Sequence, residues 1–80
     1  MNKNGIQKFA IWARRELISR ATQRAYLYGV REDGIEPESA SMDGRLLTTA
    51  EISERRALVH QVNEKGFEQV MEEVAYTWFN

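Results

Sequence analysis

Residues 66–80, GFEQVMEEVAYTWFN, decide the fold of this 80-residue chain because they carry its clearest helical pattern. Counted from Phe67, apolar residues recur at intervals of three and four, which places them on one face of a helix. This stripe consists of Phe67, Val70, Met71, Val74, Ala75 and Trp78. Only Asn80 could cap the helix that the stripe predicts. We therefore expect the chain to be a piece of a longer protein.

Two aromatic residues of this segment fall outside the stripe. At about 100° per residue, Tyr76 lies opposite the stripe and Phe79 about 120° from it, so one neighbour cannot cover all of them. Single exposed aromatic residues are common on protein surfaces, but two of them beside Trp78 favour a missing partner. Tyr76, Trp78 and Phe79 are thus candidate interface residues, either for the rest of a longer protein or for a second copy.

Length and composition limit the class of protein. Eighty residues make one domain at most, so we expect residues 1–80 to form a single helical domain of marginal stability. The chain has no cysteine and one histidine, His60, which cannot by itself form a histidine-based metal site. It has no apolar run near the roughly 18 residues of a membrane span and no apolar signal core. These features predict a cytoplasmic protein without a membrane partner.

Charge is distributed unevenly along the chain. Residues 1–31 hold seven basic residues and one acidic residue, a net charge of +6, whereas residues 32–80 hold four basic and eleven acidic residues, a net charge of −7. Two explanations compete: a basic surface for nucleic acid, or a basic helix that packs on acidic ones, which we favour. Under the first, the candidate DNA-contacting residues are Lys8, Arg14, Arg15, Arg20 and Arg24.

The first helix is predicted over Gly5–Tyr28, with Asn4 as its N-cap and Gly29 as its stop. Its apolar face is expected to start with Ile6, Phe9, Ala10, Ala13 and Leu17, and to continue with Ile18, Ala21, Ala25 and Tyr28. A long polar surface loop should follow over Val30–Leu47. Within this loop, Asp33-Gly34 and Asp43-Gly44 could each close a tight turn or a short hairpin.

The second helix is predicted to start at a capping box formed by Thr48 and Glu51, and to run to Lys65 with a stop at Gly66. Its thin apolar stripe is Ile52, Val59 and Val62, with Leu58 at the edge. Arg55 falls in the middle of the stripe, where we expect it to snorkel or to pair with an acid of a neighbouring helix. The fold class is therefore all-α, a small three-helix bundle with a long loop between its first two helices.

The familiar catalytic arrangements lack their parts here. The glycines form no phosphate-binding motif, and the serines have no nearby base besides His60, which we interpret as a half-exposed structural residue. Glu72 and Glu73 are adjacent on a helix and so point about 100° apart, as on a solvated acidic face. The chain itself is thus expected to be no enzyme and to hold no cofactor or metal.

Two blocks of this sequence resemble a known family. NKNGIQKFAIWARREL (residues 2–17) and RRALVHQVNEKGFEQVMEEVAYTWFN (residues 55–80) are similar to the extreme N-terminus of the adenine-specific DNA methyltransferases of bacteriophage-exclusion (BREX) systems. The string AYTWFN at residues 75–80, preceded by GFE at 66–68, is the most specific part. In that family the last helix continues into further residues.

The resemblance implies a parent enzyme that transfers a methyl group from S-adenosylmethionine to N6 of adenine and thereby marks host DNA. Such enzymes hold the adenine with an Asn-Pro-Pro-Tyr type motif, whereas this chain has one proline, Pro37, so no catalytic residue can be carried over. The chain would be a non-catalytic helical region that packs on the catalytic domain, contacts DNA or binds a partner. The alternatives are a helical module that acts alone, either in DNA binding or in oligomerisation through Trp78 and Phe79.

Overall fold

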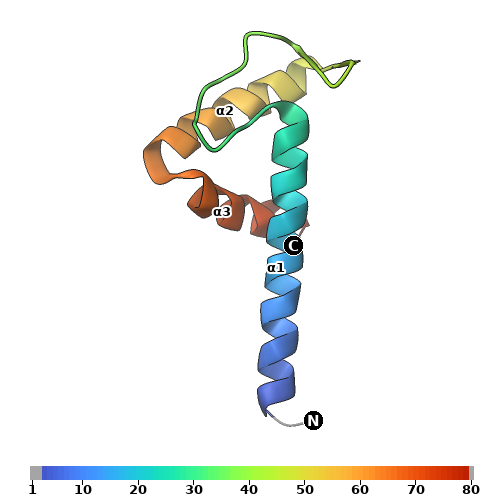
Figure 1. The fold of residues 1–80 in the computed structure, drawn as a ribbon, viewed down its shortest axis with the longest axis vertical. Coiled ribbons are helices and arrows are strands. Elements are labelled where there is room, and N and C mark those ends of the chain that lie inside the picture. The colour runs from blue at the N-terminus through green and yellow to red at the C-terminus, as the bar shows by residue number, and fades with distance from the viewer. Residues whose placement is uncertain (1–2, 80) are drawn as a thin grey trace.

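The computed structural model describes the backbone of residues 3–79 and the side-chain surroundings from Ala10 onward. Over this range the chain forms three helices and one short antiparallel hairpin (Figure 1). In chain order the elements are α1 (Lys3–Tyr28), β1 (Ser41–Met42), β2 (Arg45–Leu46), α2 (Thr49–Lys65) and α3 (Phe67–Phe79). The predicted all-α class is thereby confirmed, with the hairpin as a small addition.

Helix α1 ends where its sequence predicts, but it begins earlier. Gly29 adopts φ 91°, its N–H donates to Tyr26 O at 3.0 Å, and Val30 N–H donates to Ala25 O at 2.9 Å. These two bonds make a Schellman motif, which needs the left-handed backbone that glycine allows. The predicted N-cap at Asn4 is wrong because Asn4 lies inside the helix. Lys3 and Asn4 can both adopt helical backbone angles, and neither is a proline, so the helix includes them.

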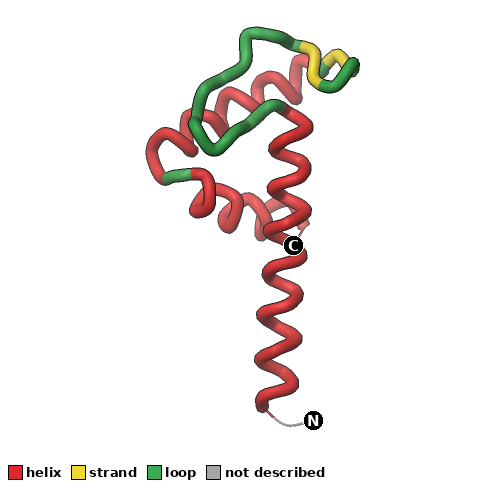
Figure 2. The backbone as a smooth tube through the Cα atoms, in the orientation of Figure 1, coloured by secondary structure: helices red, strands yellow, loops and turns green. Residues whose placement is uncertain are grey.

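The loop between α1 and α2 contains the predicted hairpin (Figure 2). Asp43 and Gly44 take φ 52° and 76°, the pair of positive values that a type I′ turn requires, and Ser41 pairs with Leu46 across it. Asp33-Gly34 also closes a turn, with Gly34 N–H donating to Arg31 O at 3.1 Å, but this turn does not join two strands. Although the loop was expected to be a surface segment, its ends, Val30 and Leu47, are buried in the core.

Helix α2 has the ends that its sequence predicts. Glu51 N–H donates to the Thr48 hydroxyl at 3.1 Å, and Thr48 N–H donates to the Glu51 carboxylate at 2.9 Å, which completes the capping box. Gly66 ends the helix with φ 90° and donates its N–H to Val62 O at 2.8 Å. Local chemistry within a few residues is therefore sufficient to place this helix.

Three side chains of α2 lie differently from their predictions. Leu58, expected at the edge of the stripe, is buried in the core because both α1 and α3 lie beside it. Arg55 is buried, but it bonds to the loop rather than to another helix: its Nη1 donates to Ser39 O at 2.9 Å and its Nε lies 4.0 Å from Glu36 Oε1. His60 is exposed rather than half-buried, with Nε2 3.0 Å from Glu64 Oε1 one turn along the same helix.

The core lies where the second half of α1 crosses α2 and α3. Met71, Val30 and Val70 are its largest fully buried side chains, and Ala21 and Ala25 of α1 are also fully buried. The predicted stripe of α3 is confirmed, since Val70, Met71 and Ala75 are buried while Phe67, Val74 and Trp78 pack partly buried against the core. The small alanine side chains allow the helices to approach closely, which brings α3 onto α1.

The first half of α1 extends beyond the rest of the molecule (Figures 1 and 2). A helix of 26 residues is about 39 Å long, whereas the 13 residues of α3 span about 20 Å and lie across α1. We call residues 3–16 the α1 arm. The apolar face predicted for this part of α1 is wrong at Ala10, which is exposed, whereas Ala13 is half-buried. The side chains of Ile6 and Phe9 lie outside the described residues.

Candidate interaction surface

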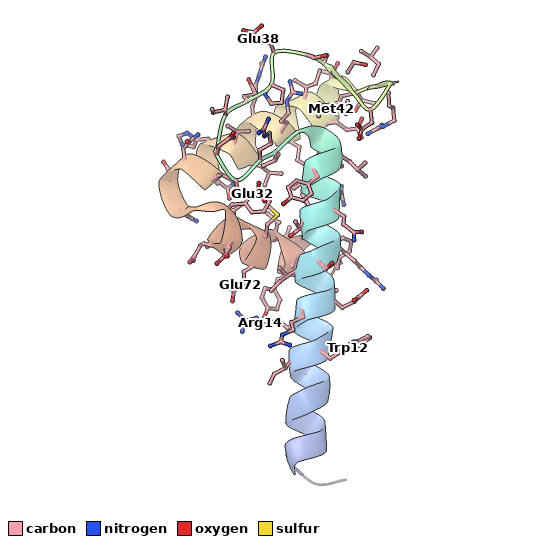
Figure 3. The ribbon with its side chains drawn as sticks, in the orientation of Figure 1. Trp12, Arg14, Glu32, Glu38, Met42 and Glu72 are labelled. Atoms are coloured by element: carbon pink, nitrogen blue, oxygen red, sulfur yellow. The ribbon has the colours of Figure 1, made fainter. Side chains whose placement is uncertain are left out.

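The basic side chains of α1 reach the acidic residues of the other two helices. Arg14 forms an ion pair with Glu72 of α3 (Figure 3), and Arg24 Nη2 lies 3.9 Å from Glu54 of α2. Each pair is partly exposed to solvent, where such contacts contribute little to stability. Their position nevertheless supports the interpretation in which a basic helix packs on acidic helices.

The structure describes two of the three remaining nucleic-acid candidates. Arg20 Nε lies 3.4 Å from Glu16 on α1 itself, and Arg15 is exposed. Lys8 lies outside the side chains that the structure describes. A phosphate backbone is bound through an array of available cations, and three of these candidates are instead next to a carboxylate.

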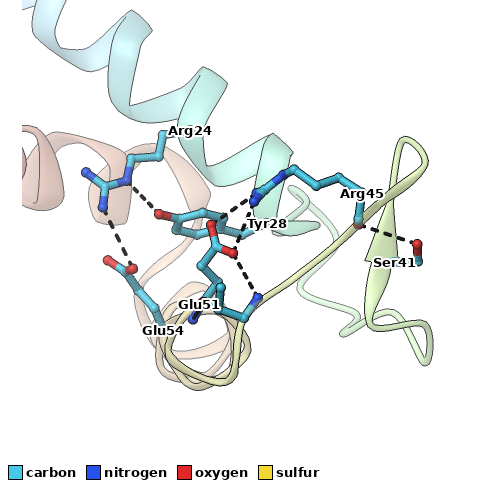
Figure 4. A network of polar contacts seen from close by, with 7 residues as sticks. Arg24, Tyr28, Ser41, Arg45, Glu51 and Glu54 are labelled. Carbon is cyan, nitrogen blue, oxygen red and sulfur yellow. Dashed lines mark hydrogen bonds and ion pairs between the residues drawn. The ribbon is translucent and has the colours of Figure 1, made fainter.

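Arg24 is the centre of a small cluster that joins all three helices. Its Nε donates to the Tyr28 hydroxyl at 2.9 Å (Figure 4), and its guanidinium carbon lies 4.4 Å from the centroid of the Trp78 ring. Trp78 also meets Tyr28 edge to face, with ring centroids 6.4 Å apart. This cation–π arrangement holds the end of α3 on α1. Of the three interface candidates, Trp78 is thus already engaged within the chain.

The other two interface candidates are more accessible. Tyr76 is half exposed and lines a small pocket with Arg14 and Leu17 of α1. Phe79 is also exposed, and it touches Trp78 edge to face with ring centroids 6.3 Å apart. Their off-stripe positions on α3 produce this exposure, in agreement with the helical pattern. Both remain available to a partner.

A second polar cluster ties the hairpin to the start of α2 (Figure 4). The Arg45 guanidinium donates two hydrogen bonds to the Glu51 carboxylate, at 3.2 and 3.1 Å. These bonds, together with the Thr48 N–H, lower the pKa of Glu51 from its ordinary 4.5 to about 2. The folded state therefore favours ionised Glu51, and a bidentate pair of this kind is the strongest geometry for an arginine and a carboxylate.

This shifted pKa predicts a specific pH dependence of stability. Because folding lowers the pKa of Glu51, the pair stabilises the fold above about pH 4.5, and this contribution is lost as the pH falls toward 2. We expect Glu51→Gln to melt at a lower temperature than the parent chain at pH 6, with the difference shrinking as the pH approaches 2. Thermal melts followed by circular dichroism measure this. A difference that stays constant between pH 6 and pH 2 would contradict it.

Sequence reasoning missed two exposed apolar residues of the α1 arm. Ile11 and Trp12 are 53% and 61% exposed, and neither was among the residues assigned to the predicted apolar face. A different signal identifies them: residues 9–13, FAIWA, are five consecutive apolar residues. A helix that has solvent on one side rarely carries such a run, because a run this long covers its whole circumference. In Figure 3 Trp12 points away from the side on which Arg14 meets Glu72.

Metal clusters and membrane-spanning helices are both absent from the part of the chain that the structure describes. Among residues 3–79 there is no group of three or more histidine, cysteine, aspartate or glutamate side chains that could hold a metal ion. Within the same range, no helix combines the length and the apolar character that crossing a membrane requires.

Comparison with known proteins relates the chain to a family of enzymes. It is 33% identical to the adenine-specific methyltransferase PglX of Lacticaseibacillus casei (strain Zhang) and 30% identical to the adenine-specific methyltransferase BrxX of Escherichia coli O9:H4 (strain HS). Both matches include 100% of this chain but only 8% of the relative's length. No family model and no solved structure matches it. The resemblance to adenine-specific methyltransferases is thus confirmed, and the chain is similar over its whole length to a short segment of PglX and BrxX.

Proposed function

We propose that this chain is a non-catalytic helical region of an adenine-specific DNA methyltransferase of the bacteriophage-exclusion type, which modifies DNA in the cytoplasm. The observation that carries the proposal is the match of the entire chain to two proteins with the name of adenine-specific methyltransferase. In this proposal S-adenosylmethionine and the target adenine are bound by residues outside the chain. The chain's partner is the rest of the same enzyme, through which it is brought to DNA.

The contacts of the reactive side chains support a structural contribution. Glu72 pairs with Arg14 and Glu51 with Arg45, while Glu73 accepts a hydrogen bond from Lys65 at 3.2 Å. The Lys65 contact lowers the pKa of Glu73 below its usual range, so this carboxylate is held ionised rather than poised to transfer a proton. His60 is exposed and adjacent to Glu64. These groups therefore pair with one another within and between the elements of the fold.

A replacement experiment tests the proposed function. The segment of Lacticaseibacillus casei PglX that matches this chain is exchanged for the chain itself, and adenine methylation is measured in cells that carry the remaining genes of that system. We expect methylation at the sites that the parent enzyme marks. The matched control carries an unrelated three-helix domain of the same length and should lose methylation. A chimera that is as soluble as PglX but methylates no more than the control would contradict the proposal.

A binding experiment tests the non-catalytic part of the proposal. Calorimetric titration of the isolated chain with S-adenosylmethionine should show no saturable heat, because the proposal places the cofactor site elsewhere in the enzyme. Full-length PglX serves as the positive control. Saturable binding to the isolated chain at micromolar concentration would place a cofactor site within these 80 residues and would contradict this assignment.

A further inference from the structure

The α1 arm is an unusual structure for a helix in water. In Figure 1 this half of α1 extends beyond α2 and α3. The side chains of Ala10, Ile11 and Trp12 are all exposed. Isolated helices shorter than about 12–15 residues are marginal in water, so an arm of this length gains little stability by itself. It also exposes an apolar patch. Both facts indicate a surface that is covered by something else.

The exposed residues point in more than one direction. Ile11 and Trp12 are neighbours in sequence and so lie about 100° apart around the helix axis. Ile11, Ile18 and Ala25 are spaced seven residues apart, about two helical turns, and so lie on the same side of α1. Ile18 and Ala25 pack in the core, whereas Ile11 lies beyond it. At the base of the arm, Tyr76 of α3 adds a half-exposed aromatic ring beside Arg14 and Leu17. A covering surface must therefore be concave and contact at least two sides of the arm.

Charge and chemistry restrict what can cover the arm. Residues 3–16 carry four basic residues and one acidic residue, a net charge of +3. A second copy of the same arm would bring like charges together, which opposes pairing of two arms. DNA would match the charge, but most of its contacts with proteins are hydrogen bonds and ion pairs to phosphate and sugar, which do not cover an apolar patch on two sides of a helix. A protein surface with an apolar centre and acidic residues around it matches both features.

We propose that the α1 arm is the docking surface through which this region is held on the remainder of the methyltransferase chain, with Ile11, Trp12 and Tyr76 as the buried centre of that contact. This inference rests on the proposed function. The partner is inferred from the relatives. The matched segment is 8% of their length, so the other 92% of such an enzyme lies in the same polypeptide and is the nearest surface that could cover the arm. Docking on the arm leaves the core of α1, α2 and α3 unchanged.

Hydrogen exchange followed by mass spectrometry tests the docking. Amides of residues 7–16 are compared in the isolated chain and in the full-length PglX chimera, in the absence of DNA. We expect these amides to exchange at least about ten-fold more slowly in the chimera, because a covered helix opens less often. The double variant Ile11→Gln, Trp12→Gln should return the exchange of the arm to the isolated-chain rate in the chimera. Glutamine keeps helix propensity while removing the apolar contact.

The matched control is Leu27→Gln, since Leu27 is on the same helix and is 53% exposed, the same fraction as Ile11, but lies at the opposite end of α1. This variant should leave the protection of the arm unchanged. Amides of α2 should keep their rates in every variant, which shows that the fold persists. Equal exchange of the arm in the isolated chain and the chimera would overturn the inference. So would protection that requires DNA, or protection of the isolated chain that increases with its concentration.

These readouts separate the inference from the proposed function. Methylation by the chimera reports the proposed function, whereas arm protection reports docking. A chimera that methylates DNA with an unprotected arm refutes the docking surface alone. A protected arm in an inactive chimera supports docking while contradicting the proposed function.

Discussion

Met71→Ala is expected to remove the cooperative thermal transition of the isolated chain. Met71 is 1% exposed and is the largest fully buried side chain, in contact with the core that α1, α2 and α3 share. Truncation of a buried methionine to alanine typically costs about 2–5 kcal/mol. A single core of this size supplies about 3–5 kcal/mol in total. Circular dichroism melts should therefore show a broad, weakly cooperative loss of helix in place of the parent transition.

The control for Met71→Ala is Gln69→Ala, an exposed position two residues away on the same helix. It should change the free energy of unfolding by no more than about 0.5 kcal/mol. Phe67→Ala should fall between the two, since Phe67 is half-buried and stacks on Tyr26 with ring centroids 5.7 Å apart. A Met71→Ala chain that melts as cooperatively as the parent, with the same midpoint, would show that this core is not what holds the three helices together.

Arg55→Ala is expected to destabilise the chain by about 2–4 kcal/mol and to release the loop before the hairpin. The side chain is 3% exposed, and its Nη1 bond to Ser39 O, at 2.9 Å, attaches the loop to α2. The loss combines the hydrogen bond of a charged donor, about 1.5–3 kcal/mol, with the packing of the aliphatic stem. Urea denaturation gives the free energy, and hydrogen exchange of residues 36–40 reports the loop.

Arg55→Met separates the two contributions to this loss. Methionine keeps most of the stem, and replacement of a buried ionic group by an apolar one of similar size is often close to neutral. Glu36 retains a partner, because Arg56 Nε lies 3.5 Å from its Oε1. We therefore expect Arg55→Met to lose less than Arg55→Ala, because the packing of the stem is kept, while the loop still exchanges faster. A loss equal to that of Arg55→Ala would show that the hydrogen bond, rather than the packing, dominates.

Elements with local signals could be predicted from the sequence. The capping box of Thr48 and Glu51, the glycine stop at Gly66 and the Asp43-Gly44 turn each depend on residues at most four apart, and the structure contains all three. The apolar stripe of α3 could also be predicted, since a helix of 3.6 residues per turn places these residues on one face regardless of which helix packs against it. Tyr76 and Phe79 are exposed for the same reason.

Contacts between residues far apart in the sequence could not be predicted, because they depend on how the helices and the loop pack together. Arg55 bonds to a loop residue 16 positions earlier, and Arg24 lies over Trp78. Both contacts depend on the path of residues 29–48, which no local rule specifies. The crossing of α1 by two shorter helices likewise left Ile11 and Trp12 exposed on the α1 arm. Helical periodicity states which residues share a face, but the lengths and crossing of the neighbouring helices decide how far along α1 that face is buried.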